Sequence, residues 1–363
     1  MSEKVKNAAR FCIVLLLSFF LGIAMIFYTR EICLGMASAI LNCLTVIIPS
    51  LYGFMALSGF LIRTNFYIYL SAPFSFASRY FFRIKPELFS VFLISLFAGY
   101  PVGAKLLYEL LEENKITQKE AETMLCFCYA GSPTFIAGLA GIKLFSSLKA
   151  GLLIYFSVIL TNLAIAIFSA PLREKPQKIK SKTEIKLSAE ILINSIESGA
   201  KALFQVCFMI VFFSIIIVIF ENLGTISFIS NILLEFTGVK NADIIVKSML
   251  EISNISSLPA NCFNYMPLIA GIFSFGGVCI ILQIAAITKG KIHLGKFILT
   301  RIISAFISPI VCHILLKAFG EGVIPVSGMP HISLRSISPI PSIFLIIMTI
   351  MLLLQKRSNL KKI

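Results

Sequence analysis

Charged residues are scarce in this sequence. They make up 13% of its 363 residues, whereas hydrophobic residues make up 58%. A soluble domain of this size is about one quarter charged, because its surface must face water. The apolar residues also fall in runs that are too long for core strands, and these runs recur from end to end. The composition therefore excludes a water-soluble globule and predicts an all-α, polytopic membrane protein.

Residues that hold metals or perform covalent catalysis are few or badly spaced. The nine cysteines include no CxxC pair, which argues against a zinc site or a disulfide framework and indicates small buried hydrophobes. The three histidines are scattered, and the chain has no HExxH or GxSxG motif. We therefore expect no enzymatic activity, no metal site and no cofactor.

Acidic residues are outnumbered by basic ones, 17 to 32, and the net charge is +15. The basic residues lie in short loops between apolar runs, where cytoplasmic orientation concentrates them, so we expect no nucleic acid as a partner. Lys4, Lys6 and Arg10 precede an apolar run from Phe11 to Tyr28 that has no cleavage site close behind it. This pattern predicts an uncleaved first span and a cytoplasmic N-terminus.

The basic loops also indicate which apolar runs cross the membrane. The run from Ile32 to Ile62 is too long for one straight crossing, and Pro49 is predicted to divide it into an approach and a crossing. The aromatic stretch from Phe66 to Phe82 is predicted to lie along the cytoplasmic interface. The loop from Arg173 to Lys186 stays cytoplasmic if the run from Phe89 to Leu111 is a re-entrant hairpin.

The second half of the chain follows the same pattern. An amphipathic approach from Ile191 leads into a crossing that ends at Phe220, and the polar segment from Asn241 to Leu258 is predicted to be a second re-entrant element. A last crossing from Ile337 to Leu354 returns a basic tail to the cytoplasm. The prediction is about eight transmembrane helices and two re-entrant helical hairpins.

The order of elements occurs twice, and the two units begin on opposite sides of the membrane. This predicts an inverted repeat with broken helices, which is typical of transporters whose substrate site lies between the repeats. Glycine and proline are also common in membrane helices for packing, so this alternative stays open. The predicted regions are a transmembrane helix (1–30), a first repeat (31–172), a basic cytoplasmic loop (173–187), a second, inverted repeat (188–318), and an external loop, last helix and basic tail (319–363).

The segment from Gly99 to Lys105 combines a glycine–proline break with an intramembrane or interfacial cation. Pro101 has no N–H and disfavours helix at Tyr100, so half-helix ends are exposed. Exposed helix N-termini attract anions, and Lys105 adds a full positive charge. The alternative is a kinked helix whose lysine reaches the interface.

Three further segments carry polar groups at predicted breaks. Ser132, Pro133 and Thr134 interrupt one crossing, although such hydroxyls also satisfy broken helices locally. Glu251 would be costly at membrane depth, and is a candidate for coupling H⁺ or Na⁺ or for pairing with Lys247, unless its helix face is solvated. The predicted substrate-binding residues are Gly99, Tyr100, Pro101, Gly103, Lys105, Ser132, Pro133, Thr134, Glu251, Ser253, Asn254, Ser274, Gly276, Gly277 and Gln283.

In these motifs the chain resembles the membrane proteins that carry a nucleoside-recognition, or Gate, domain. Among those proteins it resembles the YlbJ-like sporulation group. The resemblance rests on four segments, 99–105, 116–122, 131–136 and 274–283. It implies Gate-type repeats in which two helical hairpins and two unwound helices enclose a polar site. For the YlbJ-like group it implies a protein of the mother-cell membrane around the forespore of an endospore-forming bacterium, associated with dipicolinate import.

We therefore expect a transporter or permease for a small organic anion, with the lipid bilayer as a partner and a homo-oligomer as a candidate assembly. A planar dianion would suit the half-helix termini and Lys105. A nucleoside-type permease is one alternative. A non-transporting membrane scaffold or assembly factor for spore formation is another.

Overall fold

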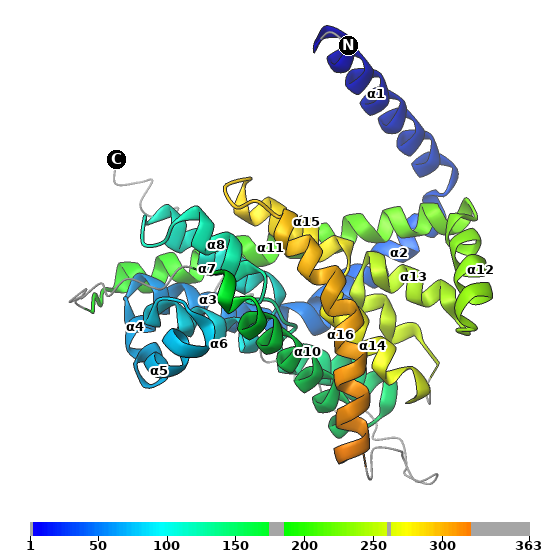
Figure 1. Ribbon diagram of the computed structural model, residues 1–363. Coiled ribbons are helices and arrows are strands. Elements are labelled where there is room, and N and C mark those ends of the chain that lie inside the picture. The colour runs from blue at the N-terminus through cyan, green and yellow to red at the C-terminus, as the bar shows by residue number, and fades with distance from the viewer. Residues whose placement is uncertain (1–2, 174–184, 260–262, 321–363) are drawn as a thin grey trace.

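The computed structural model describes residues 3–173, 185–259 and 263–320, and every regular element within these ranges is helical (Figure 1). The first helix, α1 (Glu3–Phe27), extends away from the body of the molecule (Figure 1). Most of the predicted basic loop and the whole of the predicted last crossing lie outside the described residues.

A long helix near the N-terminus carries a proline without breaking. It consists of α2 (Thr29–Asn42), a π-helical turn (Cys43–Ile47) and α3 (Ile48–Arg63), and together these span 35 residues. The prediction that Pro49 divides this stretch is wrong. The wider turn before Pro49 accommodates the missing N–H, so the helix stays continuous.

The helix α11 (Ala189–Asn222) packs along α2 and α3 in the opposite direction. A Cβ at Gly35 would lie 2.7 Å from Val218, and a Cβ at Gly199 would lie 2.9 Å from the backbone of Ala56. Glycine at these positions therefore lets the helices approach closely. At 34 residues, α11 is about 51 Å long, so it combines the predicted approach and crossing in one helix.

Gly99 separates two helices that pack against each other, α6 (Phe89–Ala98) and α7 (Tyr100–Glu112). Its φ of +98° suits glycine, and Pro101 occupies the first turn of α7. A Cβ on Gly103 would lie 3.0 Å from the Cβ of Ser95, so the two helices touch across Gly99. Both arms therefore lead away from one tip, and the membrane depth of this hairpin remains a prediction.

A chain of short helices joins α3 to α6. It comprises α4 (Phe66–Ser71), a 3₁₀ turn (Ala72–Phe74), α5 (Ser75–Ala77), a π turn (Ser78–Phe82) and a 3₁₀ turn (Pro86–Leu88). It exposes aromatic side chains that include Phe66, Tyr69, Phe76, Tyr80 and Phe81. This surface suits the predicted place at the membrane interface.

Two further helices are interrupted in the middle. In the first half, α8 (Gln118–Leu125) is followed by non-helical residues 126–132 and then by α9 (Pro133–Ile136) with its π-helical continuation (Ala137–Leu144). In the second half, α14 (Met266–Phe275) is separated from α15 (Val278–Thr288) by two glycines. Each interrupted helix is followed by a long helix, α10 (Leu148–Phe168) or α16 (Gly295–Phe319).

The remaining elements connect these helices. A 3₁₀ turn (Ala170–Leu172) ends the first half, and α12 (Thr225–Thr237) follows α11. Next come α13 (Ala242–Leu250) and a 3₁₀ segment (Ile252–Ser257), separated at Glu251. A short 3₁₀ turn (Phe263–Tyr265) precedes α14.

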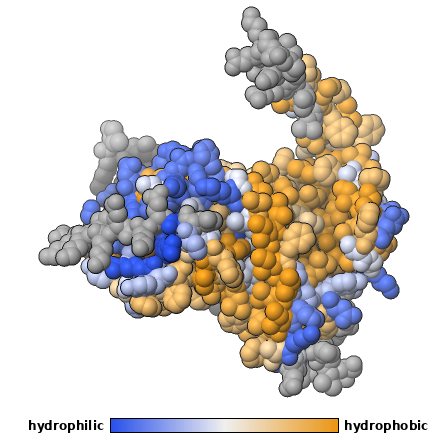
Figure 2. Space-filling model, in the orientation of Figure 1, coloured by the Kyte–Doolittle hydropathy of each residue, from blue (hydrophilic) through white to orange (hydrophobic). Residues whose placement is uncertain are grey.

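The surface is that of a multi-pass membrane protein. Five helical stretches in the described part of the chain are long and apolar enough to cross a bilayer: Thr29–Arg63, Leu148–Phe168, Ala189–Asn222, Phe263–Thr288 and Gly295–Phe319. Figure 2 shows hydrophobic residues over the middle of the molecule and hydrophilic residues gathered toward its edges. The number of eight crossings and the inverted relation of the halves remain predictions.

Candidate functional site

Two neighbouring cavities meet at Glu251. The outer cavity, of about 180 Å³, lies between α2, α11 and α13 and is lined by polar groups that include Asn42, Lys247 and Asn254. The inner cavity, of about 30 Å³, has a mainly apolar wall that includes Tyr100. Glu251 lines both, so it lies where a polar cavity adjoins a smaller, mainly apolar one.

The inner cavity is surrounded by the beginnings of helices. Tyr100 and Pro101 begin α7, Ser132 caps the N-terminus of α9, and Ile280 lies in the first turn of α15. The oxygen of Ser132 accepts a hydrogen bond of 3.1 Å from the N–H of Phe135. Helix N-termini carry partial positive charge, so three of them favour an anion in this cavity.

Glu251 is a buried carboxylate at the end of α13. One carboxylate oxygen accepts a 3.1 Å hydrogen bond from the N–H of Ser253. The other accepts from the hydroxyl of Ser253 and, at 3.2 Å, from the amide of Asn254. The basic residue on the same helix, Lys247, pairs with Glu221 at 2.6 Å instead. Glu251 is therefore satisfied by neutral donors, and a buried carboxylate of this kind is suited to binding a proton or a cation.

A tyrosine from the break in the first interrupted helix packs against the second interrupted helix. Tyr129 is fully buried and donates a 3.0 Å hydrogen bond to the carbonyl of Phe275. Tyr100 donates a 2.6 Å hydrogen bond to the carbonyl of Phe273, and the two tyrosine rings lie 4.8 Å apart. The carbonyls at the end of α14, which a continuing helix would have used, thus find partners on other elements.

The fifteen predicted site residues fall into five groups. Tyr100, Pro101, Ser132, Glu251 and Gln283 line the inner cavity, and Glu251, Ser253 and Asn254 line the outer one. Gly99, Gly276 and Gly277 form breaks with positive φ, and Ser274 is buried next to the last two. Gly103 packs against the backbone of Cys128, Pro133 begins α9, and Thr134 contacts Ser132. Only Lys105 lies in a separate cluster.

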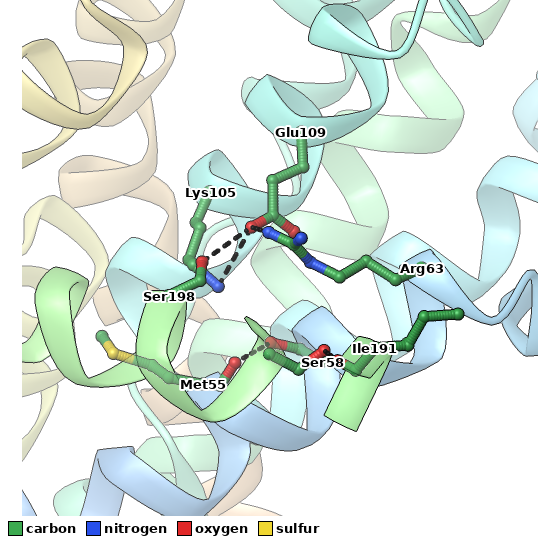
Figure 3. Close-up of polar contacts among 8 residues, drawn as sticks. Met55, Ser58, Arg63, Lys105, Glu109, Ile191 and Ser198 are labelled. Carbon is green, nitrogen blue, oxygen red and sulfur yellow. Dashed lines mark hydrogen bonds and ion pairs between the residues drawn. The ribbon is translucent and has the colours of Figure 1, made fainter. Parts of the chain in front are cut away.

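Lys105 belongs to an ionic cluster between α3, α7 and α11 (Figure 3). Its ammonium lies 3.3 Å from a carboxylate oxygen of Glu109, and the same oxygen lies 3.7 Å from Arg63. The hydroxyl of Ser198 donates to it as well, at 3.1 Å. Figure 3 shows these four side chains pointing toward one another, so Lys105 acts here as an ion-pair partner.

Removal of the Glu109 carboxylate is expected to destabilise the ionic cluster. Glu109→Gln leaves Lys105, whose side chain is 6% exposed, beside a second cation without a carboxylate. We expect this variant to lose roughly 2 kcal/mol or more of stability, because a buried charge loses its partner. The measurement is the unfolding of purified protein in detergent.

The matched control for this prediction is Glu197→Gln. Glu197 pairs with Lys201 at 2.8 Å with the same spacing along a helix, but on an exposed surface. Its loss should cost less than about 0.5 kcal/mol. Equal effects of the two variants would contradict a stabilising role for the buried cluster.

A further ion pair joins the end of α7 to the loop before α16. Lys291 contacts the carboxylate of Glu112. The hydrogen bond and charge of Lys291 lower the pKa of Glu112, and Glu112 in turn raises the pKa of Lys291. Together with the pair between Lys85 and Glu120, at 2.9 Å, it ties both arms of the α6–α7 hairpin to neighbouring elements.

Sequence reasoning missed three buried residues at the breaks. They are Tyr129, Asn162 on α10 and Arg301 on α16, each fully buried. Arg301 donates to the carbonyls of Cys126 and Ser274, one at each interrupted helix. A charge or an amide inside an apolar run is itself a signal of function, and that rule could have identified Arg301 and Asn162.

Fold and site together define a class: a multi-pass helical membrane protein whose interrupted helices border a small cavity beside a buried carboxylate. Within that class, the chain is similar to the sporulation integral membrane protein YlbJ of Bacillus subtilis (strain 168). The two are 24% identical over an alignment of 307 residues that covers 75% of this chain and 74% of that protein. The chain matches no family model and no solved structure.

In the described residues, no group of three or more metal-binding side chains is placed to hold a metal ion.

Proposed function

We propose that this protein is a membrane transporter for a small organic anion. The observation that carries the proposal is the inner cavity, where three helix N-termini meet: those of α7, α9 and α15. In many transporters, broken helices direct such N-termini at the anionic group of the substrate. Tyr100 and Gln283 are two further polar residues of the same wall.

The size of the inner cavity implies movement during transport. A volume of about 30 Å³ accommodates no more than one or two waters. The outer cavity of about 180 Å³ is the larger space, and Glu251 stands at the boundary. Transport would therefore require the α6–α7 hairpin or the segment around Glu251 to move and enlarge the interior.

The biological role proposed is in sporulation. The similarity to YlbJ, a sporulation integral membrane protein, supports a membrane role in that process. Dipicolinate, a planar dicarboxylate, is the substrate we propose, taken up across the mother-cell membrane around the forespore. Its two carboxylates match a cavity formed by helix N-termini.

The decisive experiment is uptake of dipicolinate into vesicles that contain the purified protein. We expect saturable uptake that is inhibited by other planar dicarboxylates and unaffected by uridine. Tyr100→Phe should weaken uptake roughly tenfold, because it removes the hydrogen bond that joins α7 to the end of α14. Protein-free vesicles and Glu197→Gln, a surface variant, are the controls.

Other outcomes would identify other functions. Uptake of uridine without dipicolinate would indicate a nucleoside-type permease. A second candidate, a non-transporting scaffold, is favoured by one observation: apolar side chains such as Leu51, Phe135 and Ile210 occupy most of the inner wall. Absence of any flux, together with spore defects in cells that lack the protein, would support the scaffold and contradict transport.

A further inference from the structure

Arg301 is a buried cation without a carboxylate partner. It is 0% exposed, and no acidic side chain in the described ranges forms an ion pair with it. Its guanidinium instead stacks on the rings of Tyr129, at 4.6 Å, and Phe297, at 5.5 Å. A buried charge is costly unless neighbouring groups compensate it, so these neighbours are informative.

The compensation comes from two helix ends. One nitrogen of Arg301 donates to the carbonyl of Cys126, which caps the C-terminus of α8. Another donates, at 3.4 Å, to the carbonyl of Ser274 in the last turn of α14. A helix C-terminus carries about half a negative charge, so two of them offset one guanidinium.

Arg301 is also linked to the first break indirectly, through Asn162. Arg301 donates to the amide oxygen of Asn162 at 3.1 Å, and the amide nitrogen of Asn162 donates to the carbonyl of Tyr129. The second of these hydrogen bonds reaches the non-helical residues 126–132. Arg301 therefore forms a hydrogen bond at the break in each half of the chain, whereas Asn162 forms one at the first break alone.

We propose that Arg301 is a positioning residue that holds the two half-helix C-termini together and thereby directs the N-termini of α9 and α15 at the inner cavity. Only the non-helical residues that follow Cys126 separate its carbonyl from Pro133 at the start of α9, and Phe275 with the two glycines after it separates Ser274 from Val278 at the start of α15. A shift of either carbonyl should therefore be passed on to the helix that follows it. Arg301 does not line either cavity and acts through these helices. This inference deepens the proposed function, on which its consequence for substrate affinity rests.

The test uses native cysteines next to the breaks. Cys128 lies in the first break and Cys279 in the first turn of α15, and both are fully buried. Purified full-length protein is treated with N-ethylmaleimide, and the labelling of each cysteine is followed by peptide mass spectrometry. We expect Arg301→Gln to raise the labelling rates of both cysteines about tenfold, because both breaks lose their shared partner.

Two variants separate this role from a general loss of packing. Asn162→Ala should expose Cys128 and leave Cys279 protected. Arg173→Gln is the matched arginine control, since Arg173 also donates to backbone carbonyls, those of Phe82 and Ala166, and stacks on an aromatic ring. It too should leave Cys279 protected. Exposure of both cysteines by either control, or of only one by Arg301→Gln, would overturn the proposal.

If Arg301→Gln does not fold, Arg301→Lys is measured in its place. Increased labelling of the cysteines at both breaks supports the proposal, and unchanged labelling contradicts it. In uptake assays, loss of Arg301 should raise the KM for dipicolinate about tenfold and change the maximal rate by less than about threefold. Lack of uptake by the unaltered protein would contradict the proposed function, while the labelling result would still test Arg301.

Discussion

Alanine at Gly276 is expected to destroy the junction between the two interrupted helices. A Cβ at this position would lie 1.7 Å from the hydroxyl of Tyr129, and the backbone φ of +86° is one that alanine rarely adopts. The tyrosine ring cannot retreat, because Tyr100, Phe297 and Arg301 pack around it. Backbone strain and overpacking together should cost roughly 3 kcal/mol or more and abolish uptake.

The measurements are the unfolding of purified protein in detergent and dipicolinate uptake in vesicles. Gly238→Ala is the matched control, since Gly238 also has a positive φ, +67°, but has no atom near its Cβ position. It should cost about 1 kcal/mol from backbone strain alone. Adding Tyr129→Phe to Gly276→Ala removes the clashing hydroxyl and should restore part of the stability. Equal stability of the two alanine variants would contradict the predicted clash.

Glutamine at Glu251 is expected to uncouple uptake from an ion gradient. The carboxylate lies between the two cavities, where its negative charge would repel an anionic substrate. Binding of H⁺ or Na⁺ to Glu251 would remove that repulsion, so cation and anion would enter together. Glutamine keeps the shape of the Glu251 side chain, but it carries no negative charge and cannot bind and release a proton. Accumulation against a gradient should therefore fall roughly tenfold or more, while exchange of dipicolinate across the membrane persists.

The measurement compares imposed pH and Na⁺ gradients in vesicles. Glu221→Gln is the control, because Glu221 also lines the outer cavity but already has a cationic partner in Lys247. It should retain gradient-driven accumulation. A Glu251→Gln variant that still follows the same gradient would exclude Glu251 as the coupling group and leave the anion site untouched.

The sequence was sufficient to predict an all-helical membrane protein. Long apolar runs and basic loops determine this because a bilayer leaves few ways to satisfy the backbone. The positions of the breaks at Gly99 and at Gly276 with Gly277 were also predictable, since glycine and proline act locally. Pro49 was the exception, because a π turn absorbed its missing N–H.

The candidate site was predictable only in part. Tyr100, Ser132, Glu251 and Ser274 were expected to converge on one cavity; the first three line the inner cavity, whereas Ser274 is buried and lines neither cavity. Lys105 was expected there as well, yet it pairs with Glu109 on its own helix. Which way a side chain points depends on the rotation of its helix against its neighbours, and local sequence does not specify that rotation.

By itself, then, the sequence determined that this protein folds in a lipid bilayer and where its helices break. Hydrophobicity and backbone freedom are properties of single residues and short runs, so both conclusions follow from local sequence. Only the tertiary structure decided which broken ends face each other. Arg301 shows the reason: its partners, the carbonyls of Cys126 and Ser274, lie far apart along the chain. They come together only when α8, α14 and α16 pack around one buried charge.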